Sequence, residues 1–392
     1  MVSERMKGLG TARSVIRELF EYGNIRAAEV GRENVFDFSI GNPSVPSPAA
    51  VNETAIRLLT EQPDLIHAYT SAQGAADARQ RFASSLNRRF GANYAASRLY
   101  LTVGAAASLC CVLNGLTCPG DEFIVFAPYF PEYKVFIEGA GAKMVLIPAE
   151  IEAFQIDFDA FERALSPNTK GVLVNSPNNP SGIVYSKATL EQLAAILTRK
   201  SKEYGHPIYL ISDEPYREIV YGDVEVPWVP DFYQNTLVCY SYSKSLSLPG
   251  QRIGWALIPD EIADRARFYG AFLGAARACG QVCAPALYQK VIARCGHLTA
   301  DMTVYQQNRD LLYNGLTAAG YDCVKPQGAF YLFMAAPNGN AEAFSDIAKE
   351  SGILIPAGTA YGCPGYLRIS YCVPTERVER ALPIFEKLIK TL

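Results

Sequence analysis

The segment that decides the fold reads GVLVN (residues 171–175), TLEQLAAILTRKSKEY (residues 189–204) and IYLIS (residues 208–212). The first and last runs are short and almost wholly apolar. In the middle run, apolar residues recur at three- and four-residue steps from Leu190 to Leu197, and the charges lie on the opposite face. An apolar strand, an amphipathic helix and a second apolar strand form the repeating unit of a parallel sheet. We therefore predict a sheet covered by helices on both faces.

The same pattern continues on both sides of this segment. Further apolar runs of strand length occupy residues 99–103, 122–126, 143–148, 237–243 and 255–259. With the two strands above, they predict a large α/β domain with a mostly parallel, seven-stranded type of sheet. Ligands of such sheets bind beyond the carboxyl ends of the strands, so we expect the functional residues in the loops that follow them.

A second pattern begins after Pro285. Residues 329–334 and 366–371 read as strands of a smaller sheet, and residues 301–319 and 375–392 read as helices. No Gly/Ser-rich linker separates this region from the first, which indicates that the two pack closely.

Chain length limits the number of domains. At roughly 150 residues per domain, 392 residues predict two or three. The two patterns favour two: a large domain at residues 45–285, and a smaller α+β domain formed by both chain ends, residues 1–44 and 286–392.

Composition excludes several classes of partner. The chain has 36 basic and 39 acidic residues and a net charge of −3, so no overall field favours nucleic acid or an anionic membrane. No apolar run reaches the roughly 18 residues of a membrane span, and the first fourteen residues lack the apolar core of a signal peptide. We expect a cytoplasmic protein with no nucleic-acid or membrane partner.

The cysteines and histidines give no sign of a metal site. The ten cysteines contain no C-x-x-C pair, and none of the three histidines, His67, His206 and His297, stands at zinc spacing from a cysteine. In a long chain with core-like cysteines, reduced thiols are the expected state. We predict no bound metal.

The most informative stretch for chemistry is SYSKSLSLPGQRIG (residues 241–254). A lysine at the end of an apolar strand must find a partner or lose its charge. Lys244 is therefore a candidate Schiff-base nucleophile, and Ser241, Ser243 and Arg252 are suited to an anion pocket for a phosphate. The alternative is a solvated loop with incidental basic residues.

This stretch resembles the lysine motif of the class I aminotransferases, which are fold type I, aspartate aminotransferase-like enzymes that depend on pyridoxal phosphate. Six further segments occur in that family's order: YTSAQG (69–74), VGAAAS (103–108), APYFPEY (127–133), NSPNNPSG (175–182), SDEPY (212–216) and LRIS (367–370). The resemblance covers most of the chain. It implies pyridoxal 5'-phosphate as cofactor, an amino acid and a 2-oxo acid as substrates, a homodimer, and a role in amino acid metabolism.

The resemblance also implies roles around the cofactor ring. Asp213 would face the ring nitrogen, because a buried carboxylate there keeps that nitrogen protonated. Tyr216 and Asn179 would hydrogen-bond the phenolic oxygen, and Phe130 would cover one face of the ring. Without this context, Asp213 reads as a turn or capping residue and Tyr216 as a core tyrosine.

The cofactor phosphate is implied to lie on the loop formed by Gly104, Ala105 and Ala106. Backbone N–H groups at the start of a helix, here predicted at residues 105–116, receive a phosphate without help from side chains. Many relatives have a hydroxyl residue in this loop, whereas this chain has alanines until Ser108. More of the phosphate contacts are therefore expected from the serines and the arginine of the lysine motif.

Four residues are implied on the substrate side and at the dimer interface. Arg368 would bind the substrate α-carboxylate, with Asn179 beside it and Gly41 in a mobile loop that closes over the substrate. A structural salt bridge is the alternative for Arg368. Tyr69 resembles the tyrosine that reaches the phosphate of the neighbouring subunit, so that each active site would need two chains.

The implied reaction is a ping-pong transamination in which Lys244 forms the Schiff base and moves the α-proton, with Asp213 and Tyr216 assisting. A carbon–sulfur β-lyase or another fold type I enzyme remains the alternative, because fold does not fix chemistry. A ligand-sensing regulator is disfavoured, since too little chain precedes Gly41 for a DNA-binding module. The substrate side chain stays open: Lys134 and Arg277 are candidates for a distal carboxylate by sequence proximity alone.

Overall fold

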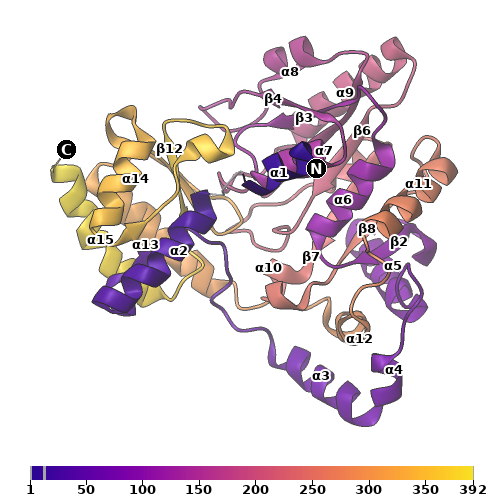
Figure 1. The fold of residues 1–392 in the computed structure, drawn as a ribbon, viewed down its shortest axis with the longest axis horizontal. Helices are drawn as coiled ribbons and strands as arrows, with labels where there is room; N and C mark the ends of the chain where they lie inside the picture. Colours follow the sequence, from indigo (N-terminus) through magenta and orange to yellow (C-terminus); the bar gives the residue numbers. More distant parts are fainter. Residues whose placement is uncertain (1, 12–14, 392) are drawn as a thin grey trace.

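The computed structural model describes residues 2–11 and 15–391, which form a large and a small part (Figure 1). The large part contains a seven-stranded sheet in the order β2-β8-β7-β6-β5-β3-β4. Its strands are β2 (Leu99–Thr102), β3 (Glu122–Phe126), β4 (Lys143–Ile147), β5 (Thr169–Asn175), β6 (Tyr209–Asp213), β7 (Thr236–Ser241) and β8 (Gly254–Leu257). Within this sheet only β8 runs antiparallel to its neighbours. The predicted mostly parallel sheet of an α/β domain is confirmed.

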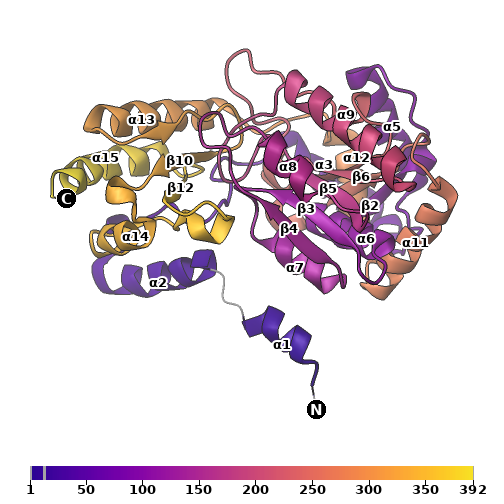
Figure 2. The ribbon, with the colours of Figure 1, turned by 90° about the horizontal axis from the view of Figure 1, so that it is seen from above.

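Helices cover both faces of this sheet (Figure 2). The helices of the large part are α3 (Ala49–Glu61), α4 (Pro63–His67), α5 (Ala76–Phe90), α6 (Ala105–Leu116), α7 (Glu132–Gly139), α8 (Phe158–Ala164), α9 (Lys187–Tyr204), α10 (Tyr242–Ser245), α11 (Arg265–Ala278) and α12 (Ala286–Cys295). Of these, α3 and α4 pack on α12. Alternate strand residues serve opposite layers: Ile211 packs with α6, α7 and α11, whereas Leu210 packs with α8 and α9. Nearly every residue of β2, β3, β5, β6, β7 and β8 is buried, which explains why their sequences are mostly apolar, whereas the edge strand β4 is partly exposed.

The small part contains a three-stranded antiparallel sheet. Its strands are β9 (Cys323–Val324), β10 (Tyr331–Ala335) and β12 (Tyr366–Ser370), with β10 in the centre. It also holds α2 (Val15–Val30), α13 (Thr303–Ala319), α14 (Ala341–Glu350) and α15 (Thr375–Lys390). β1 (Phe36–Asp37) pairs in parallel with β11 (Ile353–Leu354), so both ends of the chain build this part. Leu392, in the predicted last helix, lies outside the described residues.

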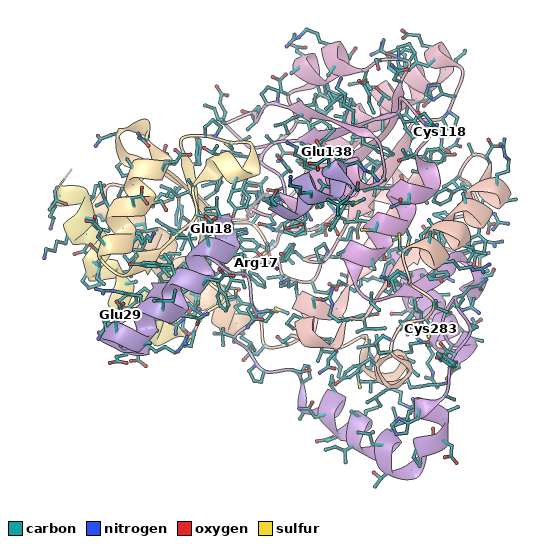
Figure 3. All side chains as sticks on the ribbon, viewed as in Figure 1. Arg17, Glu18, Glu29, Cys118, Glu138 and Cys283 are labelled. Carbon is teal, nitrogen blue, oxygen red and sulfur yellow. The ribbon has the colours of Figure 1, made fainter. Side chains whose placement is uncertain are left out.

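Two segments depart from the predicted domain division. Helix α12, assigned from sequence to the small domain, packs on α3 and α5, and its Val291 and Ile292 share a core with Val51 of α3. Helix α1 (Glu4–Thr11), assigned with residues 1–44, lies against α7 of the large part. There Arg5 Nη1 donates hydrogen bonds of 3.2 Å to the carbonyls of Glu138 and Gly139. Figure 3 labels Glu138 beside α1. An amphipathic pattern fixes which face a helix buries but not which core it joins.

The cysteines and the helices can be compared with the sequence predictions of reduced thiols and of no membrane span. All ten cysteines are free thiols. Among the residues described, no helix combines the length and the apolarity that a membrane span requires.

The local sequence of helix α9 determines where the helix begins and ends and which face packs on the sheet. The Ser186 side chain accepts a hydrogen bond of 3.0 Å from the Thr189 N–H at its start, and Gly205, with φ 73°, ends it in the left-handed region. Leu193 is fully buried against the sheet. Leu193→Ala is expected to lower the free energy of unfolding by about 2–5 kcal/mol, because it removes buried methyl groups and leaves a cavity.

Urea denaturation followed by circular dichroism measures this loss. Glu191→Ala on the exposed face of the same helix is the matched control and is expected to stay within about 0.5 kcal/mol of wild type. Equal unfolding midpoints for Leu193→Ala and wild type would contradict the packing described for α9.

Candidate active site

A cavity of about 300 Å³ lies at the carboxyl ends of the central strands, where the large and small parts meet. Most of the site residues predicted from sequence line it: Gly41, Ala105, Ala106, Phe130, Asn179, Asp213, Tyr216, Ser241, Ser243, Lys244, Arg252 and Arg368. These residues come from separate elements of both parts. The cavity is therefore formed only when the whole chain is folded.

Lys244 lies on the short helix α10, directly after β7. Its Nζ donates a hydrogen bond of 2.6 Å to the Gly41 carbonyl and lies 5.5 Å from the centre of the Phe330 ring. Burial lowers the pKa of Lys244 to about 8; nearby Cys372 raises it, and the positive charge of Arg368 lowers it further. Lys244 is thus a buried amine that deprotonates near pH 8, well below the range of a solvated loop lysine.

An anion cradle lies on one side of Lys244, at the start of α6. The first N–H groups of a helix have no acceptor within it, and Ala105 and Ala106 occupy that position on the cavity wall. The Ser241 and Ser243 hydroxyls lie 2.7 Å apart on the same wall. Arg252 reaches this loop as well, since its Nη2 donates to the Val103 carbonyl at 3.1 Å.

Gly104 contributes to the anion cradle because it has no side chain. Its φ is 96°, and an added Cβ would lie 2.9 Å from Arg252 Nη2. A glycine at this position therefore lets the arginine approach the helix start. Gly104 is the one predicted phosphate-loop residue that does not line the cavity itself.

Asp213 ends β6 on the other side of the cavity. Its Oδ2 accepts a hydrogen bond of 2.6 Å from the Tyr133 hydroxyl, whereas its buried Oδ1 has no hydrogen-bond partner in the described structure. Burial raises the pKa of Asp213 to about 7, although the Tyr133 hydrogen bond lowers it. The orphaned oxygen is suited to a cationic N–H donor, and Asp213 caps no helix.

Arg368 lies on β12 and is only 2% exposed. Its Nη1 donates to Asn179 Oδ1 at 3.0 Å and its Nη2 donates to the Ser39 carbonyl, while Nε has no partner. Among the residues that the structure describes, no carboxylate lies within ion-pair distance of this guanidinium. A structural salt bridge therefore does not explain its burial, and an anionic ligand would offset the cost.

Several cavity residues were missed by sequence reasoning. The Tyr331 hydroxyl lies 2.8 Å from the Tyr216 hydroxyl, and both tyrosines line the cavity. Tyr133, the last residue of APYFPEY, donates the hydrogen bond to Asp213 described above. Asn175 lines the cavity and donates from Nδ2 to the Asp213 carbonyl at 2.9 Å. Its place at the start of NSPNNPSG was an available signal, whereas nothing in AFYLFM distinguished Tyr331 from a core residue.

Three residues lie outside the cavity. Tyr69 does not line it and is 93% exposed. Lys134, a sequence candidate for a distal carboxylate, lies 3.9 Å from Glu138 on the exposed side of α7. Arg277, the other candidate, is exposed in the last turn of α11. Neither cation faces the cavity of its own chain.

The raised pKa of Asp213 predicts a pH effect on stability. Between pH 4 and 7 the folded apo chain holds a proton on Asp213 that the unfolded chain, with an ordinary aspartate pKa near 3.8, has released. Stability therefore falls as the pH rises through this window, by at most about 4 kcal/mol. Lys244, with its pKa lowered to about 8, acts with the opposite sign and only above pH 8.

Thermal unfolding of the apo chain at a series of pH values checks this prediction. Asp213→Asn removes the ionisable group at nearly constant shape, so the difference between the two proteins isolates Asp213 from other carboxylates. We expect the variant to gain stability relative to wild type as the pH rises from 4 to 7. If the stabilities of wild type and Asp213→Asn changed equally with pH, the raised pKa of a buried Asp213 would be contradicted.

Comparisons with known proteins agree with this geometry. A family model described as aminotransferase class I and II matches residues 33–385. An aspartate/prephenate aminotransferase of Thermus thermophilus is 30% identical over 372 residues, which cover 93% of this chain and 94% of that protein. A crystal structure of an amino transferase from Eubacterium rectale has a TM-score of 0.97 and 55% identity, covering 100% and 99% of the two chains. Aspartate aminotransferase from Thermus thermophilus with maleate has a TM-score of 0.85 and 27% identity, covering 99% of each chain.

Proposed function

The chain belongs to the class I and II aminotransferase family, and on that premise we propose that it moves an amino group between an L-amino acid and a 2-oxo acid by a ping-pong mechanism, with pyridoxal 5'-phosphate held at Lys244. One observation carries this proposal: a buried amine of lowered pKa shares a cavity with an anion cradle, an orphaned carboxylate oxygen and an unpaired buried guanidinium. Each of these features has a matching group on the cofactor or the substrate.

The residues fit pyridoxal phosphate. The start of α6, Ser241, Ser243 and Arg252 would hold its phosphate, because N–H donors and a guanidinium suit a dianion. Asp213 Oδ1, which lacks a partner, would accept the ring N–H. When bound, this cofactor supplies an aldehyde that combines with amino groups and a ring that withdraws electrons from Cα.

Other cavity residues would position the ring. The Tyr216 hydroxyl and the Asn179 amide would contact its phenolic oxygen, and Phe130 would lie against one face. Tyr331, hydrogen-bonded to Tyr216, would hold that hydroxyl in place. Burial makes the Asp213 carboxylate costly to ionise, and a cationic N–H of the ring would stabilise its charged form.

Lys244 and Arg368 would act on the substrate. Arg368 binds the α-carboxylate through its planar fork, with Asn179 and Ser39 already fixing one side of the guanidinium. Lys244 Nζ, neutral above about pH 8, would take the proton from Cα as general base and, as general acid, would deliver it to the C4′ carbon of the cofactor. Donor and acceptor both carry an α-carboxylate, so one Arg368 serves both half-reactions in turn.

We also propose a homodimer that works in the cytoplasm. A large aromatic side chain that is 93% exposed, as Tyr69 is, suits a contact with a second copy, and by the family pattern its hydroxyl would reach the partner's cofactor phosphate. Ten free thiols suit a reducing compartment. Sedimentation equilibrium of the loaded enzyme tests the dimer, and a monomer would overturn it.

A half-reaction experiment tests the proposed activity. Mixing cofactor-loaded protein with an amino acid alone should release one 2-oxo acid per site and stop, and a second 2-oxo acid should restore the starting absorption spectrum. L-Aspartate and aromatic amino acids come first in the panel of donors, since similar proteins bear the names aspartate/prephenate and aromatic-amino-acid aminotransferase. Continuous release of ammonia and pyruvate from a cysteine conjugate, without any acceptor, would instead identify a β-lyase.

A further inference from the structure

A second cavity, of about 400 Å³, lies between α5 and α12, separate from the proposed active site. Its lining includes Arg81, Arg88, Arg89, Arg217 and Arg294. Glu218 is the only acidic residue of the lining. Such an excess of one charge in a concave site raises the local concentration of counter-ions.

Two of these arginines form ion pairs with glutamates. Arg217 forms a buried ion pair with Glu214, and its Nη1 and Nη2 each donate to a backbone carbonyl at 2.9 Å. Arg89 pairs with Glu218 at 2.6 Å. These contacts assign Arg217 a structural role and leave Arg89 half-exposed at the cavity.

The other three arginines are not matched. Within the described ranges, no carboxylate lies within ion-pair distance of Arg81, Arg88 or Arg294. Arg81 and Arg88 are exposed on α5, and Arg294 lies on α12, where its Nη1 donates to the Lys290 carbonyl at 2.9 Å. Within the described residues, three arginines without an ion-pair partner thus line this cavity from two helices.

We propose that this cavity is a binding site for a phosphate-bearing anion, distinct from the cofactor site. Guanidinium groups bind phosphate and carboxylate oxygens in bidentate fashion. Three uncompensated positive charges favour a multiply charged phosphate over a single carboxylate. Inorganic polyphosphates and nucleotides are two sources of such a group, and both are used as probes below.

The cavity shares a wall with the proposed active site. Residues 240–243 alternate between the two cavities. Tyr240 and Tyr242 line the second cavity, and Ser241 and Ser243 line the first. The Tyr240 hydroxyl donates to Glu218 at 2.7 Å and lies 2.9 Å from the Ser245 hydroxyl. Because both cavities favour phosphate, the test uses enzyme saturated with pyridoxal phosphate, so that the cradle of the first cavity is filled.

Tryptophan fluorescence reports on the second cavity directly. The chain has two tryptophans, and both Trp228 and Trp255 line this cavity. Titration of the loaded enzyme with inorganic pyrophosphate, at an ionic strength held constant with NaCl, should give a saturable change in emission. NaCl alone should not reproduce it.

Charge reversal tests the proposed ligands. The double variant Arg81→Glu/Arg88→Glu is expected to weaken the apparent affinity at least about tenfold. Both side chains are exposed, and an unchanged thermal midpoint checks the fold. Arg163→Glu on α8, also exposed but outside the cavity, is the matched control and should titrate like wild type.

A parallel titration with ADP distinguishes the sources. Tighter binding of ADP than of pyrophosphate identifies a nucleotide, and the reverse order identifies an inorganic phosphate; either result supports the site. The proposal is overturned if neither probe gives a saturable change. It is equally overturned if the double variant titrates like wild type.

Discussion

Lys244→Ala is expected to lower turnover by at least about 10⁴-fold, the upper range for loss of a general acid–base group. The variant also loses the amine that we propose as the covalent attachment point of the cofactor, so the loss extends beyond proton transfer. Steady-state assay with the best donor of the panel measures turnover. Reduction with borohydride followed by mass spectrometry measures attachment: wild type should gain the mass of the cofactor on Lys244, and the variant should not.

Two further variants test whether activity needs the amine of Lys244 or only a positive charge at this position. Lys244→Arg keeps the positive charge and a long stem, but a guanidinium does not deprotonate in proteins, so it should be as inactive as the alanine variant. Lys143→Ala removes an exposed lysine at the start of β4 and should retain full activity. An alanine variant at position 244 that kept both turnover and attachment would overturn the proposed role.

Arg368→Lys is expected to lower kcat/KM for the amino donor by about 10²–10³-fold. The variant keeps one positive charge but loses the planar fork that binds a carboxylate bidentately. Truncating one partner of a buried charged pair costs about 2–5 kcal/mol, which corresponds to a loss of this size. The rate of the first half-reaction as a function of donor concentration measures it.

Arg252→Lys provides the contrast, because Arg252 lies at the anion cradle rather than beside Asn179. It should weaken retention of the cofactor during dialysis while changing the donor dependence less. Arg368→Lys should retain the cofactor and its absorption spectrum. Unchanged kcat/KM in Arg368→Lys would show that the α-carboxylate binds elsewhere.

The sheet was largely predictable from sequence. Helix α6 begins and ends where the pattern predicted, at Ala105 and Leu116, and each of the seven strands falls within two residues of its predicted run. These segments carry a strong period or a continuous apolar run, because both faces of every strand except the edge strand β4 are buried. Helix α12 was assigned to the wrong part because its apolar residues, such as Val291, fit a layer of either domain.

The site residues that sequence could predict are those whose residue type is unusual for its position. Lys244, Asp213 and Arg368 are polar residues in apolar strand contexts, and such residues stand out in a sequence. Tyr331 did not, because a tyrosine in a strand is ordinary; its proximity to Tyr216 depends on how the small sheet packs on the large one. The residue for a distal substrate group was not found, since neither Lys134 nor Arg277 faces the cavity of its own chain.

The pairing of β1 with β11 constrains the order in which the protein can fold during synthesis. Phe36 meets Ile353 roughly 300 positions later along the chain, a separation that makes loop closure entropically costly. While the ribosome is still making that distant partner, all seven strands of the large sheet have already emerged and can pair. The beginning of the small domain must therefore wait, and a translation pause before Ile353 would leave Phe36 and Phe38 exposed to chaperones.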